Sequence, residues 1–139
     1  MTRLVIDASV AIKWAVEEIG SDQALAITSL HTFSAPELLI AECANILRKK
    51  AARNEITAEH ALFATSVVAR AGVLLAPTTP LMAPALEIAM SLGHPAYDCF
   101  YLATAEREAA PLVTADDRLR AKLAGSRFAV LSLEQAAGL

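Results

Sequence analysis

Short apolar runs, rich in β-branched residues, alternate along this chain with longer stretches of helical periodicity. The runs cover residues 4–6, 33–35, 73–75, 112–114 and 128–130. Strands that are apolar along their whole length and separated by helices belong to mostly parallel sheets with helices on both faces. The sequence therefore predicts an α/β fold, a three-layer sandwich in which helices flank a central, mostly parallel sheet.

Helical patterns fill the segments between these runs. They predict helices over residues 9–16, 22–30, 36–53, 58–70, 80–92 or 82–92, 95–109 and 117–123. Pro36 suits the first turn of the third helix, Thr57 the N-cap of the fourth, and Gly93 the end of the fifth. No repeat, low-complexity tract or long linker divides the sequence, so we expect a single domain over residues 1–139.

Composition narrows the function classes. Hydrophobic residues make up 55% of the chain, which excludes intrinsic disorder, and aromatic residues only 5%, which argues against a base-stacking RNA-binding sheet. The net charge of −3 is not typical of a nucleic-acid binder, although an acidic metal site would itself lower the net charge. The phosphate-binding patterns GxxxxGK[ST] and GxGxxG are absent from the sequence.

Polar residues interrupt every long apolar tract. Asp7 and Lys13 break the first, and Arg70 lies within the tract at 61–77, so we expect no signal peptide, no membrane span and a cytoplasmic protein. Cys43 and Cys99 lack metal-binding spacing, and we expect both to be free thiols.

Two aspartates follow predicted strands. Asp7 comes directly after the first strand, and Asp116 lies two residues beyond the strand at 112–114. Ligands of open α/β sheets bind beyond the carboxyl ends of the strands, which favours a functional role for both. The alternative is that each aspartate only caps the helix that follows it.

Two further acids lie on predicted helices. Glu42 shares a stripe with Leu38, Asn45 and Lys49, beside the apolar face of its helix, and the alternative is an ordinary solvated glutamate. Asp98 shares a helical face with apolar residues at 102, 105 and 109 and is expected to point inward. A first-turn acid stabilised by the helix dipole would explain the position of Asp98 along the helix but not its face.

A cluster of these acids would need a cation. Two carboxylates about 4 Å apart repel by ~4 kcal/mol at an effective dielectric constant of about 20. Carboxylate oxygens without suitable His or Cys partners favour Mg²⁺ or Mn²⁺ over zinc. Separation along the chain does not establish that the four acids meet, so the cluster is a hypothesis at this point.

Four segments carry a family resemblance: LVIDASVAIKW at 4–14, SAPELLIAECANIL at 34–47, HPAYDCFYLATAE at 94–106 and LVTADDRL at 112–119. In this order they resemble the motif regions of PIN-domain ribonucleases, in particular VapC-like toxins of type II toxin–antitoxin systems. The resemblance implies four catalytic acids, Asp7, Glu42, Asp98 and Asp116, of which Asp7, Asp98 and Asp116 are the metal ligands. It implies supporting roles for Ser9 and Thr114, and for Asp117 as the auxiliary acid of some family members; Asn45, on the Glu42 stripe, is a further candidate.

The resemblance also implies an activity and partners. The expected activity is Mg²⁺- or Mn²⁺-dependent endoribonuclease cleavage, with a cognate antitoxin and a second copy of the chain as partners. Candidate RNA-backbone contacts are Lys13, Lys49, Arg53 and Arg118, although basic residues at helix ends also complement the helix dipole. Trp14 either anchors the core or lines a groove for the antitoxin. The alternative function is a PIN-like module that binds RNA or protein without cutting.

Overall fold

Five parallel strands form the central sheet of this computed structural model, which describes residues 2–139. The strands are β1 (Thr2–Ile6), β2 (His31–Pro36), β3 (Leu74–Ala76), β4 (Leu112–Val113) and β5 (Val130–Leu131), in the order β3-β2-β1-β4-β5. In the register, Leu4 lies opposite Phe33 and Val5 opposite Leu112. Residues 4–6 of the central strand β1 are completely buried, as a strand covered on both faces requires.

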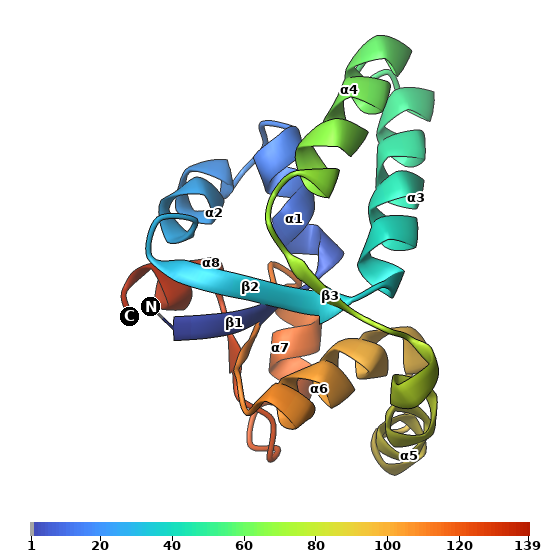
Figure 1. Ribbon diagram of the computed structural model, residues 1–139, viewed down its shortest axis with the longest axis vertical. Helices are drawn as coiled ribbons and strands as arrows, with labels where there is room; N and C mark the ends of the chain where they lie inside the picture. The colour runs from blue at the N-terminus through green and yellow to red at the C-terminus, as the bar shows by residue number, and fades with distance from the viewer. Residues whose placement is uncertain (1) are drawn as a thin grey trace.

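Helices cover both faces of the sheet (Figure 1). On one face lie α1 (Ala8–Ala15), α2 (Ser21–Ile27), α3 (Leu38–Ala52) and α4 (Ala58–Ala69). On the other lie α5 (Met82–Leu92), α6 (Ala96–Glu108) and α7 (Asp117–Leu123), with the short turn η1 (Thr79–Leu81) leading into α5. The predicted three-layer α/β fold is confirmed.

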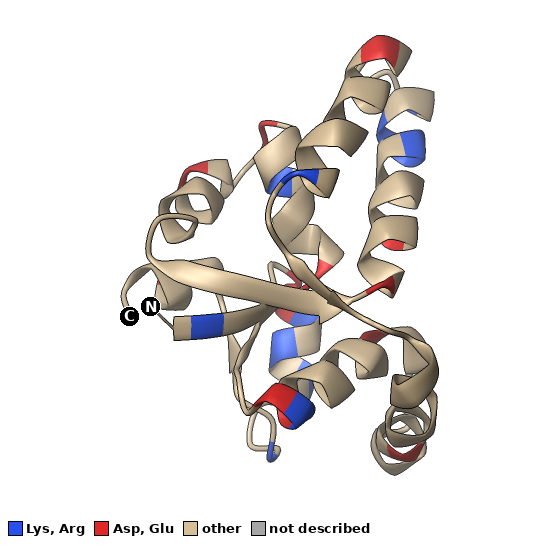
Figure 2. Cartoon of the chain, in the orientation of Figure 1, with Lys and Arg blue, Asp and Glu red and all other residues tan. Residues whose placement is uncertain are grey.

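The strand order places a topological switch point between β1 and β4. The chain leaves β1 toward β2 on one side and leaves β4 toward β5 on the other. The two connections diverge, and ligands of open α/β sheets bind at the carboxyl ends of the strands at such a point. Acidic segments of several elements gather near this edge, with basic segments on α3 and α7 (Figure 2).

Several predicted boundaries were wrong. Pro36 ends β2, pairing with Ala76, and α3 begins only at Leu38. Strand β5 covers Val130–Leu131 rather than 128–130, because the strand pairs through Val130 and Leu131 with β4. Ala109 is exposed and left-handed at φ 50°, so it ends α6 and does not continue the face of Asp98.

One helix was not predicted at all. Helix α8 (Leu133–Ala137) packs against α2 and β5. Ser132 and Gln135 form a capping box at its start, and this S-x-x-Q pattern is readable in the sequence. None of the helices over residues 2–139 combines the length and apolar character needed to cross a bilayer.

Candidate active site

Asp7 occupies the switch point. It is 9% exposed, follows β1 directly and caps α1 by accepting a 3.0 Å hydrogen bond from the Ser9 backbone N–H. Its Oδ1 also accepts from Ser9 Oγ and its Oδ2 from Thr114 Oγ1, both at 2.5 Å. Burial raises the pKa of Asp7 to about 6, helped by the charge of Asp98 and opposed by the hydrogen bonds from Ser9 and Thr114.

Ser9 and Thr114 connect the ends of the two central strands. Thr114 is completely buried, and Ser9 Oγ accepts a 2.9 Å hydrogen bond from the Ala115 N–H. The Asp116 N–H in turn donates to Thr114 Oγ1 at 3.1 Å. The segments after β1 and β4 are therefore held together through the carboxylate of Asp7.

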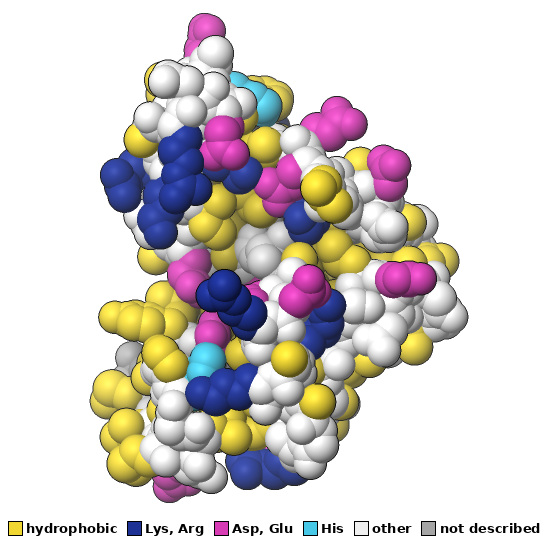
Figure 3. Space-filling view, turned by 180° about the vertical axis from the view of Figure 1, so that it is seen from behind, with side chains coloured by type: hydrophobic (Ala, Val, Ile, Leu, Met, Phe, Trp, Pro, Cys, Tyr) yellow, Lys and Arg dark blue, Asp and Glu magenta, His cyan; other side chains and the backbone are white. Residues whose placement is uncertain are grey.

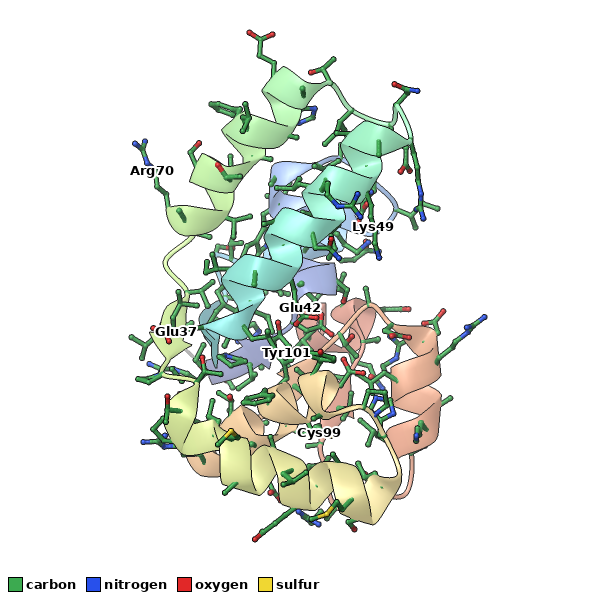
Figure 4. All side chains as sticks on the ribbon, turned by 90° about the vertical axis from the view of Figure 1, so that its right-hand side faces the viewer. Glu37, Glu42, Lys49, Arg70, Cys99 and Tyr101 are labelled. Carbon is green, nitrogen blue, oxygen red and sulfur yellow. The ribbon has the colours of Figure 1, made fainter. Side chains whose placement is uncertain are left out.

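Glu42 enters the site from α3. It is half-buried, and its Oε1 accepts a 2.6 Å hydrogen bond from the hydroxyl of Tyr101 on α6 (Figure 4). Burial raises its pKa, the charge of Asp98 adds to that effect, and the Tyr101 hydrogen bond opposes both. Asn45, one turn further along α3, is exposed and contacts Arg48 at 3.4 Å, away from these carboxylates.

Asp98 lies at the rim rather than in the interior. Its side chain is 37% exposed in the first turn of α6, while Leu102 and Ala105 on its face are buried. Its Oδ2 is 2.6 Å from Nε2 of His94. Its charge raises the pKa of both Asp7 and Glu42, so these three predicted acids interact electrostatically.

Asp116 stands at the adjacent strand end. It is exposed and caps α7, with Oδ1 accepting from the backbone N–H groups of Arg118 and Leu119 at 3.0 and 3.1 Å. Its Oδ2 makes no hydrogen bond within residues 2–139. Asp117 has an 87% exposed side chain and pairs with Arg120, away from the other acids.

The donor atoms suit a hard divalent cation by their chemistry. They are carboxylate oxygens, and Asp7 and Glu42 are partly or fully buried beside the charge of Asp98, which a bound cation would neutralise. As the side chains stand, however, no three His, Cys, Asp or Glu residues within 2–139 are close enough together to hold an ion. Glu42, Asp98 and Asp116 each hydrogen-bond to another part of the protein, so coordination would require them to adjust.

The basic residues predicted to contact RNA differ in whether their side chains are exposed to solvent. Lys49, Arg53 and Arg118 are exposed, whereas Lys13 has an 11% exposed side chain and binds Glu18 at 3.0 Å. Lys50 binds the same glutamate at 2.6 Å, which lowers the pKa of Glu18 against the effect of its burial. Figure 3 shows a hollowed face with acidic side chains near its middle and basic side chains on either side of them.

Trp14 packs against the core and also lines an open groove, while the antitoxin role of that groove stays a prediction. Its indole packs at 5.2 Å, centroid to centroid, against Phe33, and its Nε1–H donates to the Ala24 carbonyl at 2.7 Å. It also lines an open groove of about 430 Å³ with α2 and α4, where Phe63 is 67% exposed.

Two residues of the site were not predicted. Tyr101 and His94 contact Glu42 and Asp98 directly. Tyr101 lies three residues after Asp98 on α6, a spacing that puts the two on one side of the helix and that was readable in the sequence, whereas His94 precedes the helix, which begins at Ala96.

Known proteins resemble this chain in sequence and in fold. The chain matches the PIN domain family over residues 4–123. A VapC ribonuclease of Mycobacterium bovis and the ribonuclease VapC9 of Mycobacterium tuberculosis are each 34% identical to it over 116 residues, which cover 84% of this chain and 87% of each relative.

Two solved structures share the architecture. PAE2754 from Pyrobaculum aerophilum superposes with a TM-score of 0.73 at 23% identity, covering 99% of this chain and 88% of that one. VapC20 of Mycobacterium tuberculosis, described as a sarcin–ricin loop cleaving toxin, superposes with a TM-score of 0.66 at 12% identity, covering 88% of this chain and 95% of that one. At these identities the likeness concerns the fold alone. The family match over most of the sequence, together with the relatives at 34% identity, shows that the chain belongs to the PIN-domain family.

Proposed function

We propose that this protein is an Mg²⁺- or Mn²⁺-dependent endoribonuclease and the toxin of a toxin–antitoxin pair, acting in the cytoplasm. The observation that carries the proposal is the gathering of acids at the switch point of the sheet, where Asp7 and Asp116 follow the adjacent strands β1 and β4 and the charge of Asp98 raises the pKa of both Asp7 and Glu42. The relatives at 34% identity are named as VapC ribonucleases, which supports the same activity here.

Asp7, Asp98 and Asp116 are the proposed holders of the cation. When bound, the cation would supply a water of lowered pKa and would neutralise charge on the phosphodiester oxygens. Ser9 and Thr114 orient both oxygens of Asp7, and the Asp116 Oδ1 is fixed by the start of α7. Glu42 gives Oε1 to Tyr101, so its Oε2 is the atom proposed to accept a proton from the attacking water or to orient that water.

RNA would lie across the hollowed face. Lys49, Arg53 and Arg118 are exposed and are proposed to contact the phosphate backbone, which positions the strand without reading its sequence. Lys13 is also proposed to contact the RNA backbone, but to do so it would have to give up its present hydrogen bonds to Glu18 and to the Ile19 carbonyl.

Two apolar surfaces suit the proposed protein partners. The groove beside Trp14, with the exposed Leu62 and Phe63 of α4, is the proposed site for an antitoxin segment. Met82, Leu86 and Met90 of α5 are more than half exposed and are proposed to face a second copy of the chain.

A cleavage assay with matched variants tests the function. We would incubate the antitoxin-free protein with a tRNA pool and Mg²⁺ or Mn²⁺, with and without EDTA. Cleavage should need the metal and should fall by at least about a hundredfold in Asp98→Asn, as expected when a cation ligand loses its charge. Asp22→Asn, which changes an exposed first-turn acid of α2, is the control and should cleave at the wild-type rate.

Calorimetric titration with Mn²⁺ provides a readout that does not depend on the choice of RNA. The wild type should bind the ion and Asp98→Asn should bind it more weakly. If neither protein binds Mn²⁺, the carboxylate site is wrong, and RNA binding without turnover would then point to a non-catalytic module.

A further inference from the structure

Tyr101 combines a fully buried ring with a hydroxyl that reaches the acidic cluster. The side chain is 1% exposed and belongs to the main hydrophobic core. Its hydroxyl donates a hydrogen bond of 2.6 Å to Oε1 of Glu42. Because packing immobilises the ring, the direction of the O–H group is restricted, and the phenol is a rigid donor.

This hydrogen bond crosses from one helical layer to the other. Helix α6 packs against β1, β2 and β4, whereas α3 lies on the opposite face of the sheet. Glu42 and Tyr101 face each other between the ribbons of α3 and α6 (Figure 4). The contact therefore spans the edge of the sheet at which the acids gather, and it joins the two sides of the proposed active site.

Glu42 needs such a donor to stay in place. Burial disfavours its carboxylate, and the charge of Asp98 repels it, while the Tyr101 hydrogen bond acts against both effects. Glu42 is only half-buried, so a rotamer that faces solvent is open to it. Without the hydroxyl, repulsion and desolvation would favour that outward rotamer.

We propose that Tyr101 is a positioning residue that holds the Glu42 carboxylate at the carboxyl edge of the sheet, with Oε2 directed to the reacting phosphate. The proposal rests on the proposed nuclease function and adds a residue to it. It requires that Tyr101 act entirely through Glu42, and this requirement separates a positioning role from a general contribution to the core.

A double-mutant cycle tests that requirement. Tyr101→Phe removes the hydroxyl and keeps the ring, and Tyr97→Phe removes a hydroxyl from the same helix at a residue that is 67% exposed. Tyr101→Phe should cleave RNA roughly 10- to 100-fold more slowly than the wild type, the usual loss when the partner of a site residue is removed. Tyr97→Phe should cleave at the wild-type rate.

The same substitution should lose its effect when Glu42 is absent. Adding Tyr101→Phe to Glu42→Ala should leave the residual rate unchanged. A further drop of similar size in that background, or an unchanged rate in the single Tyr101→Phe variant, would overturn the proposal.

Crystal structures of the variants test the positioning role of Tyr101 without any measurement of RNA cleavage. In Tyr101→Phe the Glu42 carboxylate should turn away from Asp98; an unchanged position would contradict the proposal. Glu42→Gln keeps an acceptor for the Tyr101 hydroxyl, so the side chain at position 42 should occupy the same place in this variant. If that side chain faced solvent instead, the positioning role of Tyr101 would be contradicted, even if Tyr101→Phe failed to fold. If the wild type cleaves no RNA, the nuclease function fails, while these structures still report on Tyr101.

Discussion

The buried carboxylate of Asp7 should make the metal-free protein less stable as the pH rises. Its pKa is about 6 in the folded protein, against an ordinary value of 3.8, chiefly because of burial. Between these values the folded chain binds more protons than the unfolded chain, so Asp7 contributes stability below pH 3.8 that is lost as the pH rises through 6. Since each tenfold change in proton affinity is worth about 1.4 kcal/mol, the full contribution is about 3 kcal/mol.

The assay is urea unfolding in EDTA, followed by the fluorescence of Trp14, the single tryptophan of the chain. Other groups also titrate. Because the pKa of Glu18 is lowered, its contribution to the stability of the folded protein is lost as the pH falls, which is the opposite direction. Comparison with Asp7→Asn cancels these shared contributions. From pH 4 to pH 8 the variant should gain about 2–3 kcal/mol relative to the wild type, whatever constant cost the substitution itself brings.

A difference between the two proteins that stays constant with pH would refute the reasoning. It would mean that Asp7 has the same pKa in both states, and that its hydrogen bonds from Ser9 and Thr114 fully compensate for its burial.

The remaining predictions concern stability. Thr114→Val removes a buried hydroxyl that donates to Asp7 and should lower the free energy of unfolding by roughly 1–3 kcal/mol in urea denaturation, whereas Thr65→Val on exposed α4 surface should change it by less than about 0.5 kcal/mol. Ser132→Ala removes the capping box of α8 and should cost about 1 kcal/mol in the same assay, and an unchanged midpoint would show that α8 is held by packing alone.

Much of the fold could be predicted because its signals are local. A run such as residues 4–6 is apolar at every position, and a strand covered on both faces buries all three side chains. Pro36 was misplaced because its fixed φ suits both a strand end and a helix start, and the pairing with Ala76 that decides between them is not local. Strand β5 was misplaced for the same reason, since its register is set by β4.

The positions of the site residues along the strands and helices could be predicted from the sequence, but the contacts between their side chains could not. The sequence pattern placed Asp7 and Asp116 after strands and Glu42 beside the apolar face of its helix, whereas the structure showed that the two strands are neighbours. The Tyr101 partner of Glu42 depends on how α3 and α6 approach each other across the sheet edge, and a single sequence holds no record of that approach. Lys13 shows the same limit, because its bond to Glu18 depends on the path of the loop between α1 and α2.

Capping and a functional role are not alternatives for the strand-end aspartates. A residue that follows a parallel strand stands both at the carboxyl edge of the sheet and at the start of the next helix, so one position creates both opportunities. Asp7 caps α1 through Oδ1 and gives Oδ2 to Thr114, while Asp116 caps α7 through Oδ1 alone. Each cap fixes the carboxylate plane and so directs the second oxygen. For Asp116 that second oxygen has no hydrogen-bond donor within residues 2–139, so the cap, which first argued against a functional role, is compatible with the proposed role of Asp116 as a cation ligand.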